Sequence, residues 1–302
     1  MAIQGVMQAF PKANMLVSAI EHDSVLQPAA NYDHDCIKVH ANGLVDLKDL
    51  TQKINDQTVL VSIMYANNEI GTIQPIREIA KILQAVRKER AKKGNELPLY
   101  FHTDACQAAN YLDLHVDRLG IDLMTINGGK IYGPKQSGAL FIKTGSQLKA
   151  QILGGGQEHN KRSGTENVPS IIGLAKALYL AQTQRHHEVK RLISLQKHFF
   201  EQLSKKLPKA VINGSQANRL PNNVHITFVG TDNERLMMQL DEQGIMCAVG
   251  SACSASNEEP SHVLKAIGLT DEQAQSSLRF TMGRSNTLND IDQTIKSIIA
   301  NL

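Results

Sequence analysis

The sequence has 302 residues, is 42% hydrophobic and carries a formal net charge of +3 that is spread along the chain. It can therefore bury a large core, in one large domain or two moderate ones, and no nucleic-acid partner is expected. No apolar run has membrane-spanning length and no secretory signal opens the sequence, so we expect a cytoplasmic protein that does not bind membranes. The four cysteines lack metal-ligand spacing and should be mostly reduced.

Over the first half of the sequence, short runs rich in apolar and β-branched residues alternate with amphipathic helical patterns. The helical patterns include residues 47–54 and 76–93. The strand-like runs cover residues 15–20, 36–40, 58–66, 99–104, 122–127 and 138–143. This alternation predicts an α/β fold with a mainly parallel sheet that carries helices on both faces.

Polar residues directly follow several of the predicted strands. The polar groups at these strand ends are Glu21-His22, Asn67-Asn68, Asp104 and Lys130. In parallel sheets, chemistry collects beyond the carboxyl ends of the strands. We therefore expect these positions to belong to one site rather than to unrelated surface turns.

Lys130 follows two glycines on a predicted turn, and Asp104 ends another predicted strand. A lysine that is held in place and desolvated is a competent nucleophile toward an aldehyde. A carboxylate nearby keeps a pyridine nitrogen protonated. A lysine after glycine is more often only a surface turn, but the two groups together describe a pyridoxal phosphate site, where the cofactor is an electron sink and the protein sets its electronics.

The second half of the sequence has a different pattern. One long amphipathic helix is predicted from residue 170 to about residue 207. Further strands are predicted at residues 223–229, 245–249 and 277–282, and further helices at residues 233–244 and 288–301. We therefore expect a large cofactor-binding domain, residues 1–184, followed by a smaller C-terminal α+β domain, residues 185–302.

Five motifs occur in an order that resembles the class V, fold-type I pyridoxal phosphate enzymes. They are NNEIG (67–71), HTDACQ (102–107), GKIYGPK (129–135), RSGTEN (162–167) and GSACSAS (250–256). The last two narrow the resemblance to the cysteine desulfurases, in the housekeeping and nitrogen-fixation branch. The runs EEPS (258–261) and SSLRF (276–280) continue it, so it covers essentially the whole chain. The resemblance implies conversion of L-cysteine to L-alanine and an enzyme persulfide, for iron–sulfur cluster assembly and other sulfur transfer.

The resemblance also implies which residues hold the cofactor ring. Lys130 attaches the cofactor covalently and later moves the α-proton of the substrate, while Asp104 pairs with the pyridine nitrogen. Gln107 and Asn68 hydrogen-bond the phenolic oxygen side of the ring. His22 stacks on the ring and serves as an acid–base group.

Three further residues are implied to contact the phosphate and the substrate. Thr165 reaches the phosphate of the neighbouring subunit, which implies a homodimer, and Asn127 lies on the phosphate side. Arg279, together with Asn68, holds the substrate α-carboxylate, for which a planar two-pronged donor is well suited. Each residue alone has an ordinary structural interpretation; the combination favours the site.

Cys253 is the predicted nucleophile. The resemblance implies that its thiolate attacks the sulfur of the cysteine–cofactor adduct, and that the resulting persulfide is a transient iron–sulfur ligand. The surrounding Gly, Ser, Ala, Asn and Glu residues have no apolar periodicity, which predicts a mobile loop. Such a loop can carry the persulfide to a sulfur acceptor such as an iron–sulfur scaffold protein. A buried free thiol is the commoner state of a cytosolic cysteine, but the polar neighbours of Cys253 count against that state here.

The sequence departs from the family pattern in three places. It begins after the upstream turn that cradles the cofactor phosphate, it has Asn127 and Gly129 where a serine and a histidine usually bind that phosphate, and it ends at Leu302, soon after the last predicted helix. We therefore expect weak retention of the cofactor. Two alternatives remain: another lyase of this fold, such as a selenocysteine lyase, or a catalytically silent truncated homologue that acts as a dimerisation or scaffold partner.

Overall fold

The computed structural model describes residues 1–250 and 260–302, so Cys253 lies outside the described residues. The described residues form two compact units. The first comprises Met1–Lys38, Val45–Ala66 and Gln74–Thr183, and the second comprises Val39–Leu44, Asn67–Ile73 and Gln184–Leu302. Two short segments from the first half of the sequence therefore belong with the second unit, and no local sequence pattern indicates this.

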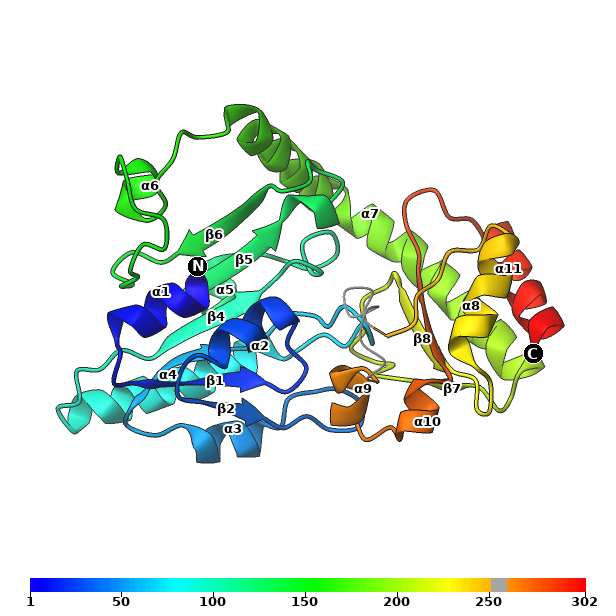
Figure 1. Cartoon of the computed structure of the whole chain (residues 1–302), viewed down its shortest axis with the longest axis horizontal. Coiled ribbons are helices and arrows are strands. Elements are labelled where there is room, and N and C mark those ends of the chain that lie inside the picture. The colour runs from blue at the N-terminus through cyan, green and yellow to red at the C-terminus, as the bar shows by residue number, and fades with distance from the viewer. Residues whose placement is uncertain (251–259) are drawn as a thin grey trace. The chain divides into compact units, whose positions relative to one another are not determined.

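Within the described residues, the first unit is built on a six-stranded sheet with the strand order β2-β1-β3-β4-β5-β6 (Figure 1). The strands are β1 (Asn14–Ser18), β2 (His34–Ile37), β3 (Thr58–Ser62), β4 (Tyr100–Asp104), β5 (Leu123–Asn127) and β6 (Gly138–Ile142). Neighbouring strands pair in parallel except β5 and β6, which are antiparallel. The predicted mainly parallel sheet is confirmed.

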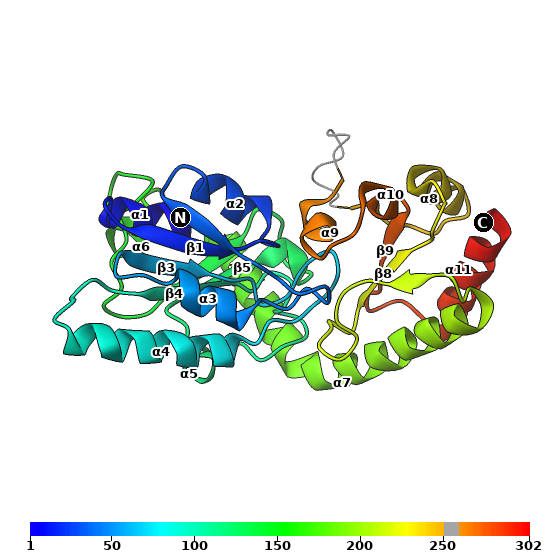
Figure 2. The ribbon, with the colours of Figure 1, turned by 90° about the horizontal axis from the view of Figure 1, so that it is seen from below.

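Helices cover both faces of this sheet, as predicted. The helices of the first unit are α1 (Ala2–Ala9), α2 (Asp23–Ala29), α3 (Leu47–Lys53), α4 (Ile76–Lys92), α5 (Val116–Leu119) and α6 (Gln157–Asn160). Figure 2 shows α1 and α2 on one face of the sheet and α4 on the other. Helix α4 buries Ile76, Ile79 and Leu83, which lie on one helical stripe, and its other faces are polar.

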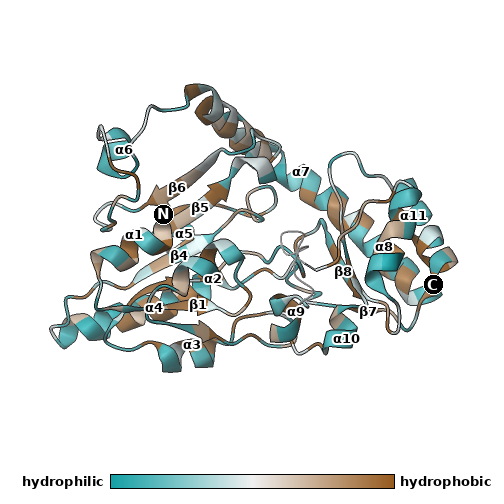
Figure 3. Cartoon of the chain, viewed as in Figure 1, coloured by the Kyte–Doolittle hydropathy of each residue, from teal (hydrophilic) through white to brown (hydrophobic). Residues whose placement is uncertain are grey.

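The core of the first unit lies between the sheet and helices α1 and α2. It joins Val6 and Met7 of α1 to Met15 and Val17 of β1 and to Leu60 of β3, all fully or almost fully buried. Every residue of β3 is buried, which is typical of a central strand covered on both faces. In Figure 3 strands β1 and β5 are largely brown and β4 is paler, whereas the helices carry teal faces. Hydrophobic burial on both faces therefore fixes the sheet in place.

The second unit is built on a smaller antiparallel sheet with the order β7-β8-β9, in the part of the chain that the structure describes. Its strands are β7 (Val211–Ile212), β8 (Asn223–Thr227) and β9 (Ser277–Thr281), and its helices are α8 (Asn233–Glu242), α9 (His262–Ala266), α10 (Asp271–Ala274) and α11 (Leu288–Asn301). Helix α11 begins with a capping box between Thr287 and Asp290. The predicted smaller α+β part is confirmed.

Helix α7 (Val168–Lys206) contributes to both units. In its first half, the side-chain amide of Gln182 donates hydrogen bonds to Ala109 O at 2.7 Å and Leu112 O at 3.1 Å. In its second half, the amide of Gln196 donates to Leu220 O at 2.9 Å and Asn223 O at 2.7 Å. No helix among the described residues, α7 included, is long and apolar enough to cross a membrane.

The strand predicted at residues 245–249 does not form. Only Ala248 pairs, through an isolated antiparallel bridge to Arg279, while Met246 is 83% exposed. Gly244 and Gly250 flank the run with positive φ values of +77° and +47°, which bend the chain away from an extended path. An apolar run was therefore not sufficient to make a strand here.

Two glycines with nearly the same backbone conformation test how tightly residues 67–73 pack. Gly71 and Gly94 have φ values of +71° and +72°, but a Cβ at Gly71 would lie 2.6 Å from Asn223 Oδ1, whereas one at Gly94 would have no contact within 4 Å. We expect Gly71→Ala to lower the free energy of unfolding by about 2–4 kcal/mol and Gly94→Ala by about 1 kcal/mol. Urea denaturation measures both, and equal losses would contradict the described packing.

Candidate active site

The first unit brings several predicted site residues to the carboxyl edge of its sheet. Asp104 ends β4 and Asn127 ends the neighbouring strand β5, where Asp104 pairs with Thr125. Lys130 follows β5 as the last residue of a short 3₁₀ turn, η1 (Gly128–Lys130). His22 follows β1, four residues after the strand ends. Parallel pairing therefore directs these groups toward the same edge.

A compact hydrogen-bonded turn presents Lys130. Asn127 Oδ1 accepts a hydrogen bond from Gly129 N at 2.8 Å, and Asn110 Nδ2 donates to Lys130 O at 2.8 Å. Only glycine fits at position 128, because a Cβ there would lie 2.1 Å from Ser137 Oγ. The backbone of Lys130 is thereby held while its side chain is exposed, which leaves the amine accessible.

Asp104 is held by backbone groups on both sides. Its Oδ1 accepts from Cys106 N at 2.8 Å, and its carbonyl oxygen accepts from Tyr65 N at 2.8 Å. Burial, followed by the charge of Asp104 and a hydrogen bond to it, raises the pKa of the Cys106 thiol, while the Lys130 charge opposes this pKa shift. The geometric link between Asp104 and Lys130 is the pairing of Asp104 with Thr125 on β5, the strand that Lys130 follows.

His22 is the N-cap of α2, and this contact orients its ring. Its Nδ1 accepts from Ser24 N at 3.1 Å and lies 2.9 Å from Ser24 Oγ. Because Nδ1 accepts the backbone hydrogen bond, the neutral ring carries its proton on Nε2. The imidazole is half-buried and therefore combines a fixed orientation with an accessible edge.

Glu21, directly before His22, is a completely buried carboxyl group. Its Oε1 accepts from Ser18 Oγ at 2.5 Å and from Met64 N at 2.7 Å. Burial raises the pKa of Glu21 to about 8, the charge of Asp104 contributes to this rise, and the two hydrogen bonds oppose it. Glu21 thus joins β1 to the segment after β3 as a neutral group at pH 7.

His102 supplies a second buried link across the sheet. Its Nδ1 lies 2.8 Å from Ser62 Oγ on β3, and its Nε2 lies 2.9 Å from Thr125 Oγ1 on β5. Burial lowers the pKa of His102 to about 4, although the charge of Asp104 acts in the opposite direction. The sequence motif contains His102, but only its flanking strand partners reveal that it is a neutral structural group.

The remaining predicted residues lie elsewhere. Gln107 is half-buried in the turn after β4, and Thr165 is exposed between α6 and α7. Asn68 and Arg279 belong to the second unit, where Arg279 Nη1 donates to Asn68 O at 3.0 Å. Asn68 and Arg279 are thus described within the second unit alone, and Cys253 is outside the described residues.

The groups at the edge of the first sheet fit pyridoxal phosphate chemically. The carboxylate of Asp104 suits a protonated ring nitrogen, and the exposed amine of Lys130 suits the aldehyde. Among residues 1–250 and 260–302, no three His, Cys, Asp or Glu residues could hold a metal ion together. The metal role of Cys253 stays a prediction, because Cys253 lies outside the described residues.

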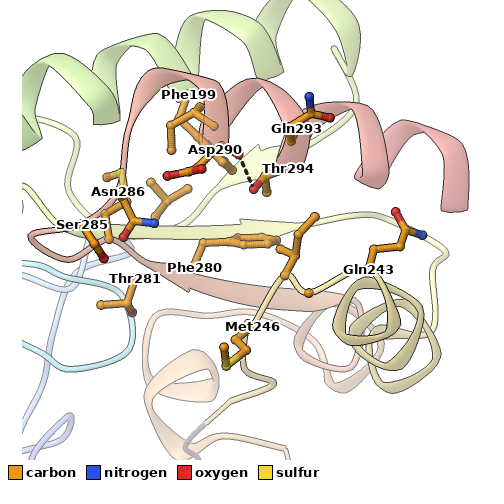
Figure 4. Close-up of a pocket in the computed structure, with 15 residues that line it drawn as sticks. Phe199, Gln243, Met246, Phe280, Thr281, Ser285, Asn286, Asp290, Gln293 and Thr294 are labelled. Atoms are coloured by element: carbon orange, nitrogen blue, oxygen red, sulfur yellow. Dashed lines mark hydrogen bonds between the residues drawn. The ribbon is translucent and has the colours of Figure 1, made fainter.

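The second unit also has a cavity of about 520 Å³ that is separate from these residues. Its lining includes Phe199, Phe280, Asp290 and Thr294 (Figure 4). Thr294 Oγ1 donates to Asp290 O at 2.8 Å, and the Asp290 carboxylate accepts from Thr287 N at 2.8 Å. Asp290 therefore already serves in the capping box of α11 and Thr294 bonds within that helix, and no predicted site residue lines the cavity.

Comparisons with known proteins agree on one family. The family model described as Aminotransferase class-V matches residues 1–294. "Cysteine desulfurase IscS" of Dictyoglomus turgidum is 41% identical over 302 residues, which cover 98% of this chain and 74% of that protein. A solved "NIFS-LIKE PROTEIN" aligns with a TM-score of 0.87 at 28% identity, covering 99% of this chain and 78% of that one. "SspA in complex with cysteine" aligns with a TM-score of 0.74 at 31% identity, covering 93% and 77%.

The raised pKa of Glu21 predicts how its replacement changes stability with pH. The folded chain holds the proton up to about pH 8, whereas the group's ordinary pKa is 4.5. The stabilisation by neutral Glu21 is therefore complete below pH 4.5 and is lost as pH rises toward 8, at no more than about 1.4 kcal/mol per pH unit. Glu21→Gln keeps an acceptor but cannot ionise, so the variant should gain stability relative to the wild type between pH 5 and 8.

Urea denaturation of the cofactor-free protein across this pH range measures the effect. Glu96→Gln, at an exposed position, is the matched control and should follow the wild type throughout. Parallel stability profiles for Glu21→Gln and the wild type would show that Glu21 is ionised in the folded protein and would contradict this description.

Proposed function

We propose residue roles for the reaction of this chain. The chain belongs to the class-V aminotransferase family and, within it, to the cysteine desulfurases. Cysteine desulfurases take sulfur from L-cysteine and pass it to an acceptor, and they depend on pyridoxal phosphate. The proposal concerns the residues that perform each step. What supports it is the arrangement of His22, Asp104 and Lys130 at one edge of the parallel sheet.

Lys130 and Asp104 are the central pair of this proposal. When bound, pyridoxal phosphate supplies an electron sink for the bonds at the substrate α-carbon. Lys130 would hold the cofactor through its amine, and that amine would move the α-proton of the substrate, because its exposed side chain extends from a fixed turn. Asp104 would keep the ring nitrogen protonated. His22 would lie against the ring and could move a proton through Nε2, since its Nδ1 accepts from Ser24 N.

The other proposed contacts orient the cofactor and the substrate. Gln107 and Asn68 would donate to the phenolic oxygen of the cofactor. Asn127 would lie on the phosphate side, and Thr165 would reach the phosphate of the neighbouring subunit. Arg279 binds the substrate α-carboxylate, with Asn68 beside it. The hydrogen bond from Arg279 to Asn68 O supports this pairing, because it fixes one arm of the guanidinium.

We assign the nucleophile to Cys253 because the other three cysteines are poorly suited. A thiolate is the reactive form of cysteine. Burial raises the pKa of Cys106 and, together with the charge of Asp35, that of Cys36, and burial raises the pKa of Cys247 to about 11. These three thiols are therefore protonated at neutral pH, which makes them weak nucleophiles.

The persulfide on Cys253 then requires an acceptor. Within this proposal the acceptor is an iron–sulfur scaffold protein, and Cys253 contacts the forming cluster transiently through its persulfide. A cytoplasmic setting is part of the proposal, because a reducing compartment keeps the attacking thiol free.

A homodimer is also part of the proposal. Helix α7 exposes Val168, Ile171, Ile172 and Tyr179 in its first half, with Ile172 at 63% exposure. We call these four side chains the α7 apolar face. Exposed apolar patches on a folded unit mark interaction surfaces, and a second copy that covers this face by two-fold symmetry would bury both faces at once.

Sulfur transfer tests the assignment of the nucleophile. With pyridoxal phosphate and L-cysteine supplied, the wild type should form alanine and a persulfide that mass spectrometry maps to Cys253. Cys253→Ser should still bind L-cysteine but release no sulfur, and Cys36→Ser should behave as the wild type. Undiminished sulfide release by Cys253→Ser would indicate a lyase of another kind, and no alanine from the wild type would indicate a silent homologue.

Light scattering at micromolar concentration tests the dimer. The wild type should be a dimer, and Ile172→Lys should be largely monomeric because it places a charge in the α7 apolar face. Ile193→Lys is the control, since Ile193 is 51% exposed on the same helix but outside that face. A monomeric wild type, or a dimer that tolerates Ile172→Lys as well as the control, would contradict this part of the proposal.

A further inference from the structure

Residues 67–73 of the second unit form a closed turn. Asn67 N donates to Thr72 O at 2.9 Å, and Gly71 N donates to Asn67 O at 3.1 Å. Asn67 Oδ1 also accepts from Glu69 N at 2.8 Å and from Ile70 N at 2.9 Å. The turn therefore keeps its shape through its own backbone and one buried side chain.

The same turn is fastened to the rest of the second unit. Leu220 N donates to Gly71 O at 2.8 Å, and Ile73 N donates to Asn218 O at 2.9 Å. Asn223, the first residue of β8, donates from Nδ2 to Glu69 O at 2.7 Å. The turn is thus hydrogen-bonded to β8 and to the segment that precedes it.

Two side chains from distant parts of the sequence donate hydrogen bonds to this turn. Arg279 reaches the carbonyl oxygen of Asn68, as described above. Ser261 Oγ lies 2.6 Å from Glu69 Oε2, and the Glu69 side chain is 1% exposed. These two contacts join positions 192 and 211 residues apart in the sequence.

Ser261 has a second task at the start of α9. Its Oγ accepts from Val263 N at 3.1 Å and from Leu264 N at 3.4 Å, so it is the N-cap of that helix. Because its oxygen accepts from α9, its hydroxyl proton is available for the Glu69 carboxylate. One hydroxyl therefore links the start of α9 to the turn.

The sequence around Cys253 runs between two anchored points. On its N-terminal side, Ala248 exchanges two backbone hydrogen bonds with Arg279, at 3.0 and 2.8 Å. On its C-terminal side, Ser261 is held by Glu69. Both anchors lead to the turn formed by residues 67–73, directly through Glu69 or through Arg279.

We propose that Glu69 and Ser261 are positioning residues that fix the C-terminal end of the Cys253 segment to the turn that also holds Arg279. This inference rests on the proposed roles of Cys253 and Arg279. The hydrogen bond from Ser261 to Glu69 sets the position of Ser261, which follows the Cys253 segment in the sequence, on the turn that also accepts from Arg279. Glu69 itself touches neither substrate nor cofactor in this account.

The proposal predicts a split between substrate binding and sulfur transfer. Arg279 donates to the backbone oxygen of Asn68, so this hydrogen bond has a backbone acceptor and not a side-chain acceptor. Loss of the Glu69–Ser261 bond should therefore leave the apparent KM for L-cysteine within about threefold, while persulfide formation at saturating L-cysteine slows by about tenfold or more. A change in KM alone would assign Glu69 to substrate binding and overturn the proposal.

Four variants of the full chain, loaded with pyridoxal phosphate, provide the test. Glu69→Ala removes the acceptor, and Ser261→Asp keeps a capping oxygen but replaces the donor with a negative charge. Glu69→Gln and Ser261→Thr keep both the acceptor and the donor. The first pair should show the slow persulfide formation, and the second pair should stay within about threefold of the wild type.

Amide hydrogen exchange of the cofactor-free protein gives a second measurement that does not require turnover. Peptides covering residues 67–73 and 260–266 should exchange faster in Glu69→Ala and Ser261→Asp, but not in Glu69→Gln and Ser261→Thr. If Glu69→Ala does not fold, the Ser261 pair carries the comparison. Wild-type rates and exchange in Glu69→Ala or Ser261→Asp would overturn the proposal.

The experiments distinguish failure of the proposed function from failure of the positioning role of Glu69 and Ser261. If the wild type forms no persulfide at Cys253, the proposed function is wrong, while the exchange pattern still decides whether Glu69 holds Ser261. If the wild type forms the persulfide and the variants form it equally fast, the function stands and the positioning role is wrong.

Discussion

The parallel pairing of β1, β3, β4 and β5 is the constraint on which the rest of the site depends. It directs the carboxyl ends of these strands to one edge of the sheet, so that Asp104 and the turn with Lys130 become neighbours. Polar groups at that edge need partners once they are buried. Glu21 and His102 meet this need by linking β1, β3 and β5 in neutral form. Glu21 and His102 are thus neutral, hydrogen-bonded groups that the charge of Asp104 acts on.

The second unit places its polar groups differently. Its small antiparallel sheet provides the strand that carries Arg279, but the turn that receives Arg279 comes from residues 67–73, directly after β3 in the sequence. This turn is held by Asn67 from within and by Asn223 from outside. A segment from the first half of the sequence thus provides the second unit with a hydrogen-bond acceptor for the Arg279 side chain.

Much of this arrangement could be predicted from local patterns. Strand β3 has an apolar centre at residues 59–61, and α4 has a clear buried stripe, so both were predictable. The partner of Glu21 is a backbone N–H 43 residues away, and no local pattern encodes such a contact. Residues 245–249 resemble a strand in composition, but flanking glycines with positive φ leave only Ala248 paired. The motifs supplied the predicted site residues, whereas the roles of the buried groups Glu21 and His102 could be seen only in the fold.

Lys130, the exposed lysine at the end of the turn after β5, is the residue proposed to hold the cofactor. Borohydride reduction of the pyridoxal phosphate complex, followed by peptide mapping, measures directly which amine carries it. The account predicts a single pyridoxyl phosphate label on Lys130, with none on Lys135, which follows the same turn. A label on another lysine, or stoichiometric cofactor without any labelled lysine, would contradict the account.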